Sequence, residues 1–267
     1  FRPDANFDGL ASIAITTNDR GLTGSGGPQE DIDTVPITVT PVNDAPSNLV
    51  PGPQAINEDT QLIFSAANGN AIVATDDAGA LPVEVTLAAA NGTLTLSQTT
   101  GLDFSFSGGA GDGTADVLMR FRGALAAINA AMDGMFFLGD LNYNGSASAI
   151  ITTNDLGNAG GATPLSDTDT VTINVVAVND PPVNLFNGLT APFTATTNDE
   201  DPVTFASTSS PVRVLAISDV DAGAAGIVRV SLAADHGVIT LNGRNGLTFT
   251  VGDGVTDTSM SFTGTMT

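Results

Sequence analysis

The sequence has no cysteine, no tryptophan and no lysine, and it has only one tyrosine and one histidine among 267 residues. The absence of cysteine excludes a disulfide-stapled fold and a cysteine-ligated zinc site. The seven basic residues are all arginines. They are too few and too scattered to form the basic surface of a nucleic-acid-binding protein, so we expect no nucleic acid partner. No run of about 18 apolar residues is present, so we expect no membrane span in this chain.

An excess of carboxylates is the feature that this composition leaves to explain. The 29 Asp and Glu residues, against seven basic residues, give a formal net charge of −22. The apolar fraction of 42% is too high for a simply disordered chain. The length fits about two ordinary domains, so we expect an acidic, globular protein.

The chain repeats itself at a fixed spacing. Residues 1–46 and 137–182 are identical at 24 of 46 positions without a gap, at an offset of 136 residues. For example, the segment ITTND at Ile15–Asp19 recurs unchanged at Ile151–Asp155. Self-similarity of this kind is the signature of a repeat architecture.

A looser match covers the remainder of the chain. GDGTAD at Gly111–Asp116 recurs as GDGVTD at Gly252–Asp257. We therefore interpret residues 1–46 as the C-terminal part of one repeat, residues 47–182 as a complete repeat and residues 183–267 as the N-terminal part of a further repeat. Since the sequence starts without Met inside one repeat and stops inside another, we expect a piece of a longer tandem array.

Alternating apolar and polar residues predict β-strands in each repeat. The alternation is clearest in residues 35–39 and 171–175, and it recurs in residues 104–106, 239–241 and 249–251. Asn-Gly and Asp-Gly dipeptides separate the alternating runs and indicate turns. Many short strands in a unit of this length predict an all-β fold of β-sandwich repeats.

One segment departs from the β pattern. Gly123–Met132 reads GALAAINAAM, in which Leu125, Ile128 and Met132 are spaced three and four residues apart. This spacing, together with the abundance of alanine, predicts one short helix per repeat, which crosses one end of the sandwich. An alanine-rich loop is the alternative.

Acidic clusters recur at the repeat boundaries and at strand ends. They comprise Asn43-Asp44 and Asn179-Asp180 at the boundaries, Glu58-Asp59 and Glu200-Asp201 one strand later, and Asp76-Asp77 and Asp219-Val220-Asp221 after an apolar run. These side chains offer hard oxygen ligands, and about six to eight oxygens describe a Ca²⁺ site. Clustered carboxylates repel one another, and a divalent ion removes that cost. We therefore predict Ca²⁺ as the cofactor.

These motifs together resemble the cadherin-like tandem repeats, with VNDAP boundaries, of large bacterial extracellular adhesins and surface proteins. The resemblance covers the whole chain and rests on VNDAP at Val42–Pro46, VNDPP at Val178–Pro182, NEDT at Asn57–Thr60, SDVDAG at Ser218–Gly223, GDGTAD at Gly111–Asp116, GALAAINAAMDG at Gly123–Gly134, and NYNGSA at Asn142–Ala147 with TTND at Thr152–Asp155. It implies Ig-like or cadherin-like β-sandwiches with Ca²⁺ at the junctions between repeats.

The resemblance also implies where the Ca²⁺ ligands come from. The linker supplies one Asp, the preceding repeat supplies an acidic residue near its start, and the following repeat supplies an Asp-x-Asp pair. The second junction would then use Glu58, Asp180, Asp219 and Asp221.

The first junction, by the same resemblance, would use Asp44 with Asp76 or Asp77, and its upstream partner precedes residue 1. Glu200, with Asp201, would serve a junction beyond the last residue. The middle repeat has two adjacent Asp residues instead of Asp-x-Asp, which puts bidentate ligation by that pair in doubt.

Other interpretations of the acidic residues stay open. A solvated surface that keeps the chain soluble is the alternative for the clusters as a whole. Asn18-Asp19 and Asn154-Asp155 precede glycine-rich loops, where either an ion within the repeat or turn chemistry alone explains them. Gly108–Asp112 is shorter than the glycine-rich Ca²⁺-binding repeats of β-helices and occurs once, so we interpret it as a loop.

The expected function is structural, not enzymatic. His236 is the only histidine, and Asn91 stands in its place in the middle repeat, so a catalytic histidine cannot recur in every repeat. We expect a calcium-rigidified extracellular spacer or adhesion stalk on the cell surface. Its partners would be neighbouring repeats of the same chain, and also cell-surface ligands or identical chains in a fibre. The alternatives are a subunit of a self-assembling filament or surface layer and a glycan-binding module, which the scarcity of aromatic residues disfavours.

Overall fold

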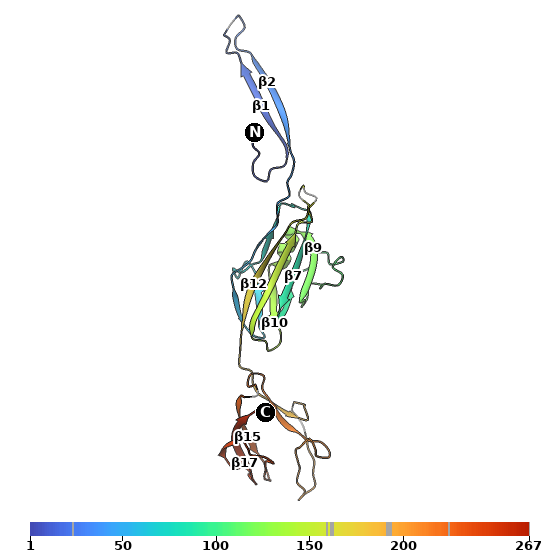
Figure 1. The fold of residues 1–267 in the computed structure, drawn as a ribbon, viewed down its shortest axis with the longest axis vertical. Helices are drawn as coiled ribbons and strands as arrows, with labels where there is room; N and C mark the ends of the chain where they lie inside the picture. The colour runs from blue at the N-terminus through green and yellow to red at the C-terminus, as the bar shows by residue number, and fades with distance from the viewer. Residues whose placement is uncertain (23, 159, 161–162, 191–193, 224, 267) are drawn as a thin grey trace. The chain divides into compact units, whose positions relative to one another are not determined.

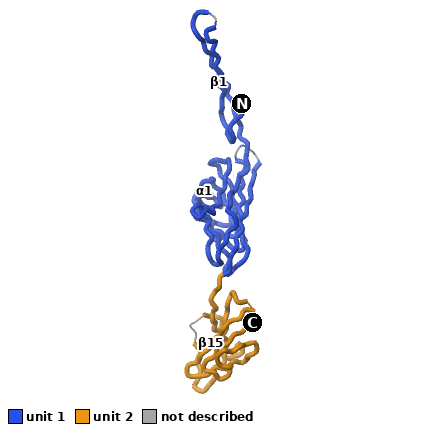
Figure 2. Tube along the Cα trace, turned by 90° about the vertical axis from the view of Figure 1, so that its left-hand side faces the viewer, with its two compact units in different colours: residues 1–177 blue, residues 178–267 orange. Residues whose placement is uncertain are grey.

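The computed structural model divides the chain into two compact units, residues 1–177 and residues 178–267 (Figures 1 and 2). The structure describes residues 1–22, 24–158, 160, 163–190, 194–223 and 225–266. These described residues contain strands β1 to β17 and a single helix, α1. The all-β fold class expected from the sequence is therefore confirmed.

A long β-hairpin precedes the first boundary. Strand β1 (Gly9–Asn18) pairs antiparallel with β2 (Glu30–Val39), from Gly9 opposite Val39 to Asn18 opposite Glu30. In the middle repeat, β11 (Gly145–Asn154) pairs with β12 (Ser166–Val176) in the same register, 136 residues later. The sequence identity of the two segments therefore extends to their backbone pairing.

The complete middle repeat is a β-sandwich. Its larger sheet has the strand order β4-β12-β11-β7-β9, its smaller sheet has the order β5-β10-β8, and β3 pairs with β6. The strand bounds are β3 Ser47–Leu49, β4 Gln54–Asn57, β5 Gln61–Phe64, β6 Val73–Thr75, β7 Pro82–Ala90, β8 Gly92–Thr95, β9 Leu118–Ala124 and β10 Met135–Gly139. Strand β4 runs parallel to β12, and the other pairings are antiparallel.

The two sheets enclose one hydrophobic core. Val85 and Leu87 of β7, Ile151 of β11 and Phe137 of β10 are each at most 1% exposed. Alternate residues of these strands face inward, as the period of a half-buried strand requires. Burial of this apolar surface provides the main driving force for folding of the repeat.

The helix lies within the predicted segment. Helix α1 spans Leu125–Met132, whereas residues 123 and 124 belong to the end of β9. Ile128 and Met132 are buried in the core, and no side chain caps the helix N-terminus. A helix of about two turns is marginal alone, so packing against the core stabilises it.

The second unit repeats part of this arrangement. Its strands are β13 Val183–Phe186, β14 Leu215–Ser218, β15 Ile227–Ala233, β16 Thr248–Val251 and β17 Ser259–Thr265. Strands β13 and β14 pair with each other, and the other three form a sheet in the order β15-β17-β16. Leu232 lies opposite Met260 in this sheet, and Leu87 lies opposite Met119 in the middle repeat. Strands β15 and β17 are therefore the counterparts of β7 and β9.

Two of the strands expected from alternation did not form, and those predictions are wrong. Residues 104–106 enter a turn directly after an isolated bridge at Asp103. The Ser105 N–H donates to Asp103 Oδ1 at 2.8 Å, a local bond that competes with strand pairing. Residues 239–241 likewise contribute only an isolated bridge. The predicted strand at residues 249–251 is confirmed as part of β16.

Candidate metal site at the repeat boundary

The first boundary segment enters the middle repeat beside the acidic pair that follows β6. Pro46 restricts Ala45 to extended conformations, which carries the chain straight from the boundary into β3. Ser47 at the start of β3 pairs with the last residue of β6. The Asp44 N–H donates to Asp77 Oδ2 at 3.3 Å. Strand pairing therefore brings the boundary aspartate next to the acidic pair.

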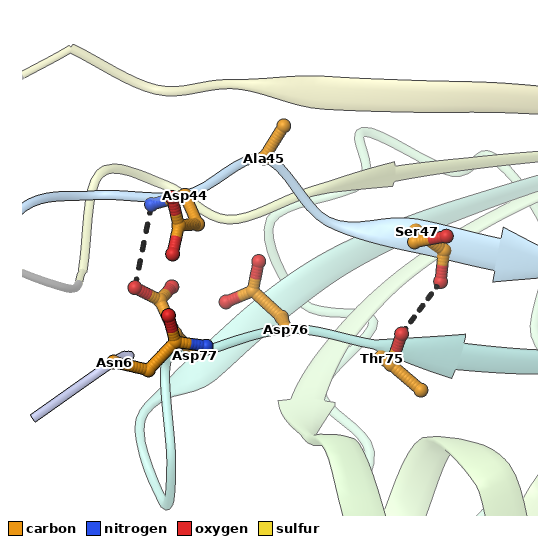
Figure 3. Close-up of a pocket in the computed structure, with 7 residues that line it drawn as sticks. All are labelled: Asn6, Asp44, Ala45, Ser47, Thr75, Asp76 and Asp77. Atoms are coloured by element: carbon orange, nitrogen blue, oxygen red, sulfur yellow. Dashed lines mark hydrogen bonds between the residues drawn. The ribbon is translucent and has the colours of Figure 1, made fainter. Parts of the chain in front are cut away.

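Three carboxylates face one hollow at this boundary. Figure 3 shows the side chains of Asp44, Asp76 and Asp77 pointing toward one another. The hollow has a volume of about 270 Å³. Its lining is completed by Asn6, Ala45, Ser47 and Thr75. The structure thus brings together three residues that the sequence assigned to the first junction.

Two carboxylate oxygens in this hollow are buried and have no hydrogen-bond donor among the described residues. They are Oδ2 of Asp76 and Oδ1 of Asp77. The other oxygen of Asp76 accepts the Ala78 N–H at 2.8 Å. A buried acceptor without a partner costs about 1–3 kcal/mol. The pair is therefore suited to a cation or donor that the described residues do not supply.

A fourth carboxylate, Asp155, holds the boundary from inside the repeat. Asp155 is 0% exposed. Its Oδ1 accepts the N–H groups of Gly157 and Leu165, each at 2.8 Å. Its Oδ2 accepts a hydrogen bond from Asn43 Nδ2 at 2.7 Å. Because Asn43 directly precedes Asp44, this bond ties the boundary segment to the end of β11.

The electrostatics of the hollow penalise full ionisation. Burial raises the pKa of the Asp76 carboxyl above its ordinary value, and the negative charges of Asp77, Asp155 and Asp44 raise the pKa further. The Ala78 N–H opposes this change by stabilising the charged form. Without a cation, like charges therefore repel in a partly desolvated space.

The donor set of the boundary fits Ca²⁺ by its chemistry. All candidate ligands are carboxylate or amide oxygens, which Ca²⁺ prefers. In the part of the chain that the structure describes, no three acidic or histidine side chains lie close enough together to hold a metal as placed. Binding of Ca²⁺ would therefore require Asp44, Asp76 and Asp77 to close around the hollow.

The second boundary repeats one contact of the first. The Asp180 N–H donates to Asp221 Oδ2, as the Asp44 N–H donates to Asp77 Oδ2. Asp219 Oδ1 accepts two backbone N–H groups, at 3.0 and 3.1 Å. In each acidic pair, the second aspartate therefore accepts a backbone hydrogen bond from the linker aspartate. This residue is Asp77 in the middle repeat and Asp221 in the last repeat.

Glu58 lies at the end of the middle repeat opposite to Asp155. Strand β12 begins beside Asp155 and ends at Val176, whose carbonyl accepts the Glu58 N–H at 2.9 Å. Glu58 is 5% exposed. Asp180 follows Val176 by four residues along the chain but belongs to the second unit. The assignment of Glu58 to the second junction stays a prediction.

The backbone adds Asp199 to the candidates next to Glu200. Asp59 and Glu200 have positive φ values of 57° and 68° in their turns. The residues directly before them are Glu58 and Asp199, so Asp199 stands in the place of Glu58. Both Asp199 and Glu200 are exposed in the second unit.

Asp155 contacts the boundary segment, although sequence reasoning did not assign it to the boundary. In the hairpin, its counterpart Asp19 accepts the N–H groups of Gly21 and Gln29 at 2.8 and 2.9 Å. These bonds, that of Gln29 first, lower the pKa of the Asp19 carboxyl. In both repeats, Oδ1 of this aspartate therefore accepts the N–H groups of its own loop. Only Oδ2 of Asp155 accepts a hydrogen bond from the boundary, from Asn43. The sequence signal that could have found this contact is that the same dipeptide, Asn-Asp, stands both at the boundary (Asn43-Asp44) and before the loop (Asn154-Asp155).

Two other motifs with functional potential are turns. In GDGTAD, Asp116 Oδ2 accepts the backbone N–H groups of residues 112–114 at 2.7–3.2 Å, and Asp257 makes equivalent bonds in the second unit. Consecutive backbone N–H groups of this kind can form an anion-binding site, and here the Asp116 carboxylate occupies it. His236 and Asn91 occupy equivalent turns, with positive φ values of 55° and 58°. These residues shape the loops of the repeats.

No family model matches the chain, and no curated protein sequence matches it. Among solved structures, the chain is similar to the crystal structure of mouse cadherin-23 EC22-24, with 17% sequence identity and a TM-score of 0.33. The match covers 97% of this chain and 65% of that chain. At this identity and TM-score, the likeness assigns neither a family nor a function. Within the described ranges, no helix is long and apolar enough to cross a membrane.

Proposed function

We propose that this chain is a structural segment of tandem β-sandwich repeats in an extracellular adhesion or surface protein, stiffened by Ca²⁺ at its repeat boundaries. The observation that supports this function most strongly is the boundary hollow. There, buried oxygens of Asp76 and Asp77 lack a donor among the described residues, next to the linker residue Asp44. In this proposal the chain acts as a spacer or stalk.

Stiffening follows from where the candidate ligands are attached. Asp44 belongs to the linker, whereas Asp76 and Asp77 follow β6 of the sandwich. An ion shared by these carboxylates would fix the linker to the repeat. Without the ion, the same carboxylates repel one another, and the hydrogen bond from Asn43 to Asp155 is one tie that remains.

An extracellular location fits the expected affinity of such sites. Extracellular calcium modules bind with dissociation constants of about 10⁻⁴–10⁻³ M, which matches the abundance of Ca²⁺ outside cells. The resemblance of the boundary motifs to bacterial adhesin repeats supports a large surface or secreted protein as the source. The target of adhesion would lie in other parts of that protein.

Thermal unfolding with and without calcium tests the proposed function. With Ca²⁺ at a hundredfold excess over its dissociation constant, the free energy of unfolding should rise by about 2.7 kcal/mol. A chelator should reverse the increase. The double variant Asp76→Asn/Asp77→Asn should lose most of the response of the middle repeat, whereas Asp140→Asn, an exposed acid outside the hollow, should keep it. An unchanged melting temperature in calcium would reject the proposal.

A further inference from the structure

Two arginines of the middle repeat share a single carboxylate. Arg120 and Arg122 of β9 direct Nε and Nη2 to Glu84 of β7, Arg120 to Oε1 and Arg122 to Oε2. The cluster therefore keeps one positive charge, in a chain whose formal net charge is −22. The third nitrogen of each guanidinium group, Nη1, has no hydrogen-bond acceptor among the described residues. Because the two arginine side chains are 43% and 37% exposed, a ligand can reach them.

The guanidinium groups are held in place before any ligand binds. The guanidinium carbon of Arg122 lies 4.0 Å from the ring centroid of Phe106, and that of Arg120 lies 5.2 Å from it. Together with the bonds to Glu84, which is 8% exposed, these contacts restrict both side chains. Binding of an anion would therefore cost little side-chain entropy.

The fold of the repeat does not require arginine at these two positions. Strand β17 is the counterpart of β9, and it has Ser261 in the place of Arg120 and Thr263 in the place of Arg122. The arginine pair is therefore a feature of the middle repeat and not a condition of the strand pairing.

A row of hydroxyl groups continues from Arg120 across the outer face of the larger sheet. Arg120 lies opposite Thr86, Thr86 lies opposite Thr152, and Thr152 lies opposite Thr168. Thr168 is exposed, and the other three residues are half-buried. Neighbouring strands are about 4.8 Å apart. The row therefore offers polar side chains at intervals close to the length of one hexose unit.

The adjacent row, which begins at Arg122, is also polar. Arg122 lies opposite Glu84, Glu84 lies opposite Asn154, and Asn154 lies opposite Ser166. Glu84, whose charge the arginines neutralise, is the only carboxylate of the two rows. The acidic residues of β12 alternate with Thr168 and therefore lie on the opposite face of the sheet.

We propose that this face of the middle repeat binds a glycan that carries one carboxylate. Arg120 and Arg122 hold the carboxylate through Nη1, and the neutral sugars lie along the threonine row. Guanidinium groups bind carboxylates through charge-assisted hydrogen bonds. Threonine hydroxyls, like those of sugars, both donate and accept hydrogen bonds. This contact goes beyond the role of a spacer and is additional to any adhesion target that other parts of the protein recognise.

Charge selects a glycan with a single carboxylate as the occupant. One uncompensated positive charge matches one carboxylate, whereas the 29 acidic residues of the chain repel a polyanion. Guanidinium and hydroxyl groups replace the aromatic platform that this composition, without tryptophan, does not supply.

A peptide fits this face less well, because the strand edge beside the arginines is occupied. Arg122 exchanges both backbone hydrogen bonds with Asp103, at 2.8 and 2.9 Å. The Arg120 N–H donates to the carbonyl of Ala110 at 3.0 Å. A peptide therefore cannot add to β9 as a further strand, and the polar rows offer no pocket for apolar side chains.

An NMR titration of the full chain in chelator tests the proposal. The probe is a trisaccharide of glucose units that ends in glucuronic acid, and its control is the same trisaccharide ending in glucose. The acidic probe should bind about tenfold more tightly, as one charge-assisted hydrogen bond predicts. The amide signals of Arg120, Thr86 and Thr152 should shift as it binds.

Two variants locate the binding face. Arg120→Gln should weaken binding of the acidic probe about tenfold. Arg20→Gln, which removes the same charge from an exposed loop of the hairpin, should not. Because Arg120 also bonds Glu84, a second variant is needed that leaves the cluster intact. Thr168→Val removes an exposed hydroxyl at nearly constant shape, and it should weaken binding about threefold without changing the melting temperature.

Three results would overturn the proposal. They are no binding of the acidic probe, equal affinity for the two trisaccharides, and equal binding of acetylglycylglycine, a peptide with one carboxylate, which would show a general anion site. Since chelator removes calcium, failure of this test is distinguishable from failure of the calcium-stiffened boundary.

Discussion

Asp76 combines three properties that are unfavourable without a bound cation. One of its oxygens is buried without a donor among the described residues, its pKa is raised, and three other carboxylates contribute to the negative potential around it. An asparagine of nearly the same shape would remove the charge and with it the repulsion. It would also remove a ligand for Ca²⁺. Substitution at this residue therefore separates stability without calcium from the response to calcium.

The variant Asp76→Asn should melt about 1–3 °C higher than the unmodified chain in chelator, as relief of less than about 1 kcal/mol of repulsion predicts. In calcium, its increase in melting temperature should be less than half that of the unmodified chain. Scanning calorimetry in both conditions measures the two effects. Asp140→Asn serves as the control, and a variant that keeps the full calcium response would show that Asp76 is not a ligand.

The raised pKa of Asp76 gives the contribution of this carboxyl to the stability of the calcium-free chain a pH dependence of definite sign. A raised pKa in the folded state favours the protonated carboxyl. Its contribution to stability is therefore fully present below the unfolded value of 3.8 and is lost as pH rises through the folded pKa. The pKa values of Asp19 and Asp103 are lowered, so their contributions to stability depend on pH with the opposite sign. Both residues are present in the unmodified chain and in Asp76→Asn, so their contributions cancel when the two proteins are compared.

In chelator, the advantage of Asp76→Asn over the unmodified chain should shrink as the pH falls from about 7 toward about 4. Melting temperatures of the two proteins across this range measure the difference. A difference that is constant or that grows on acidification would contradict the raised pKa of this carboxyl.

At the scale of elements, a charged cluster ties β7 to β9 in the middle repeat. Glu84 of β7 is 8% exposed and accepts hydrogen bonds from Arg120 Nε at 2.7 Å and from Arg122 Nε at 2.9 Å. The Arg122 guanidinium lies 4.0 Å from the ring centroid of Phe106. Removal of the carboxylate would leave both arginines without their shared partner.

Glu84→Gln should therefore lower the free energy of unfolding of the middle repeat by about 1.5–3 kcal/mol, the range for hydrogen bonds to charged groups. Urea unfolding followed by circular dichroism provides the measurement. Glu30→Gln, a change at an exposed residue of the hairpin, is the matched control and should leave the midpoint unchanged. If both variants unfold at the same urea concentration, the cluster does not stabilise the repeat.

The sequence predicted the secondary structure best where the identity between repeats and the spacing of apolar residues indicated the same element. The identity between residues 1–46 and 137–182 anticipated two hairpins, and their registers match residue for residue. The alanine-rich segment gave α1 to within two residues. Prediction failed at residues 104–106, where the side chain of Asp103 bonds the following backbone and ends the bridge. That bond follows from local geometry, which alternation alone does not encode.

The candidate site was predictable only in part, because its residues come from distant segments. Asp44, Asp76 and Asp77 recur at boundaries and strand ends, and the structure places them around one hollow. Asp155 was missed because its bond to Asn43 spans 112 residues and depends on how the sandwich closes. Its other oxygen, Oδ1, accepts the N–H groups of a local turn, so the sequence around Asp155 looks like a turn alone.

At the scale of the whole molecule, the net charge of −22 has more than one origin. Part of it lies in the boundary clusters, and at the first boundary the carboxylates of Asp44, Asp76 and Asp77 line a hollow. Another part caps turns, as Asp116 and Asp257 do with backbone N–H groups. Exposed acids of the hairpin, such as Asp31 and Asp33, add a solvated surface. Only the first group should respond strongly to calcium.

Small-angle X-ray scattering of the chain in calcium and in chelator, at a concentration where it is monomeric, tests the proposed stiffening most directly. The account predicts a larger maximum dimension and a narrower distribution of conformations in calcium. The double variant Asp76→Asn/Asp219→Asn should give the same curve in both conditions. Identical curves from the unmodified chain in calcium and in chelator would contradict a calcium-stiffened spacer.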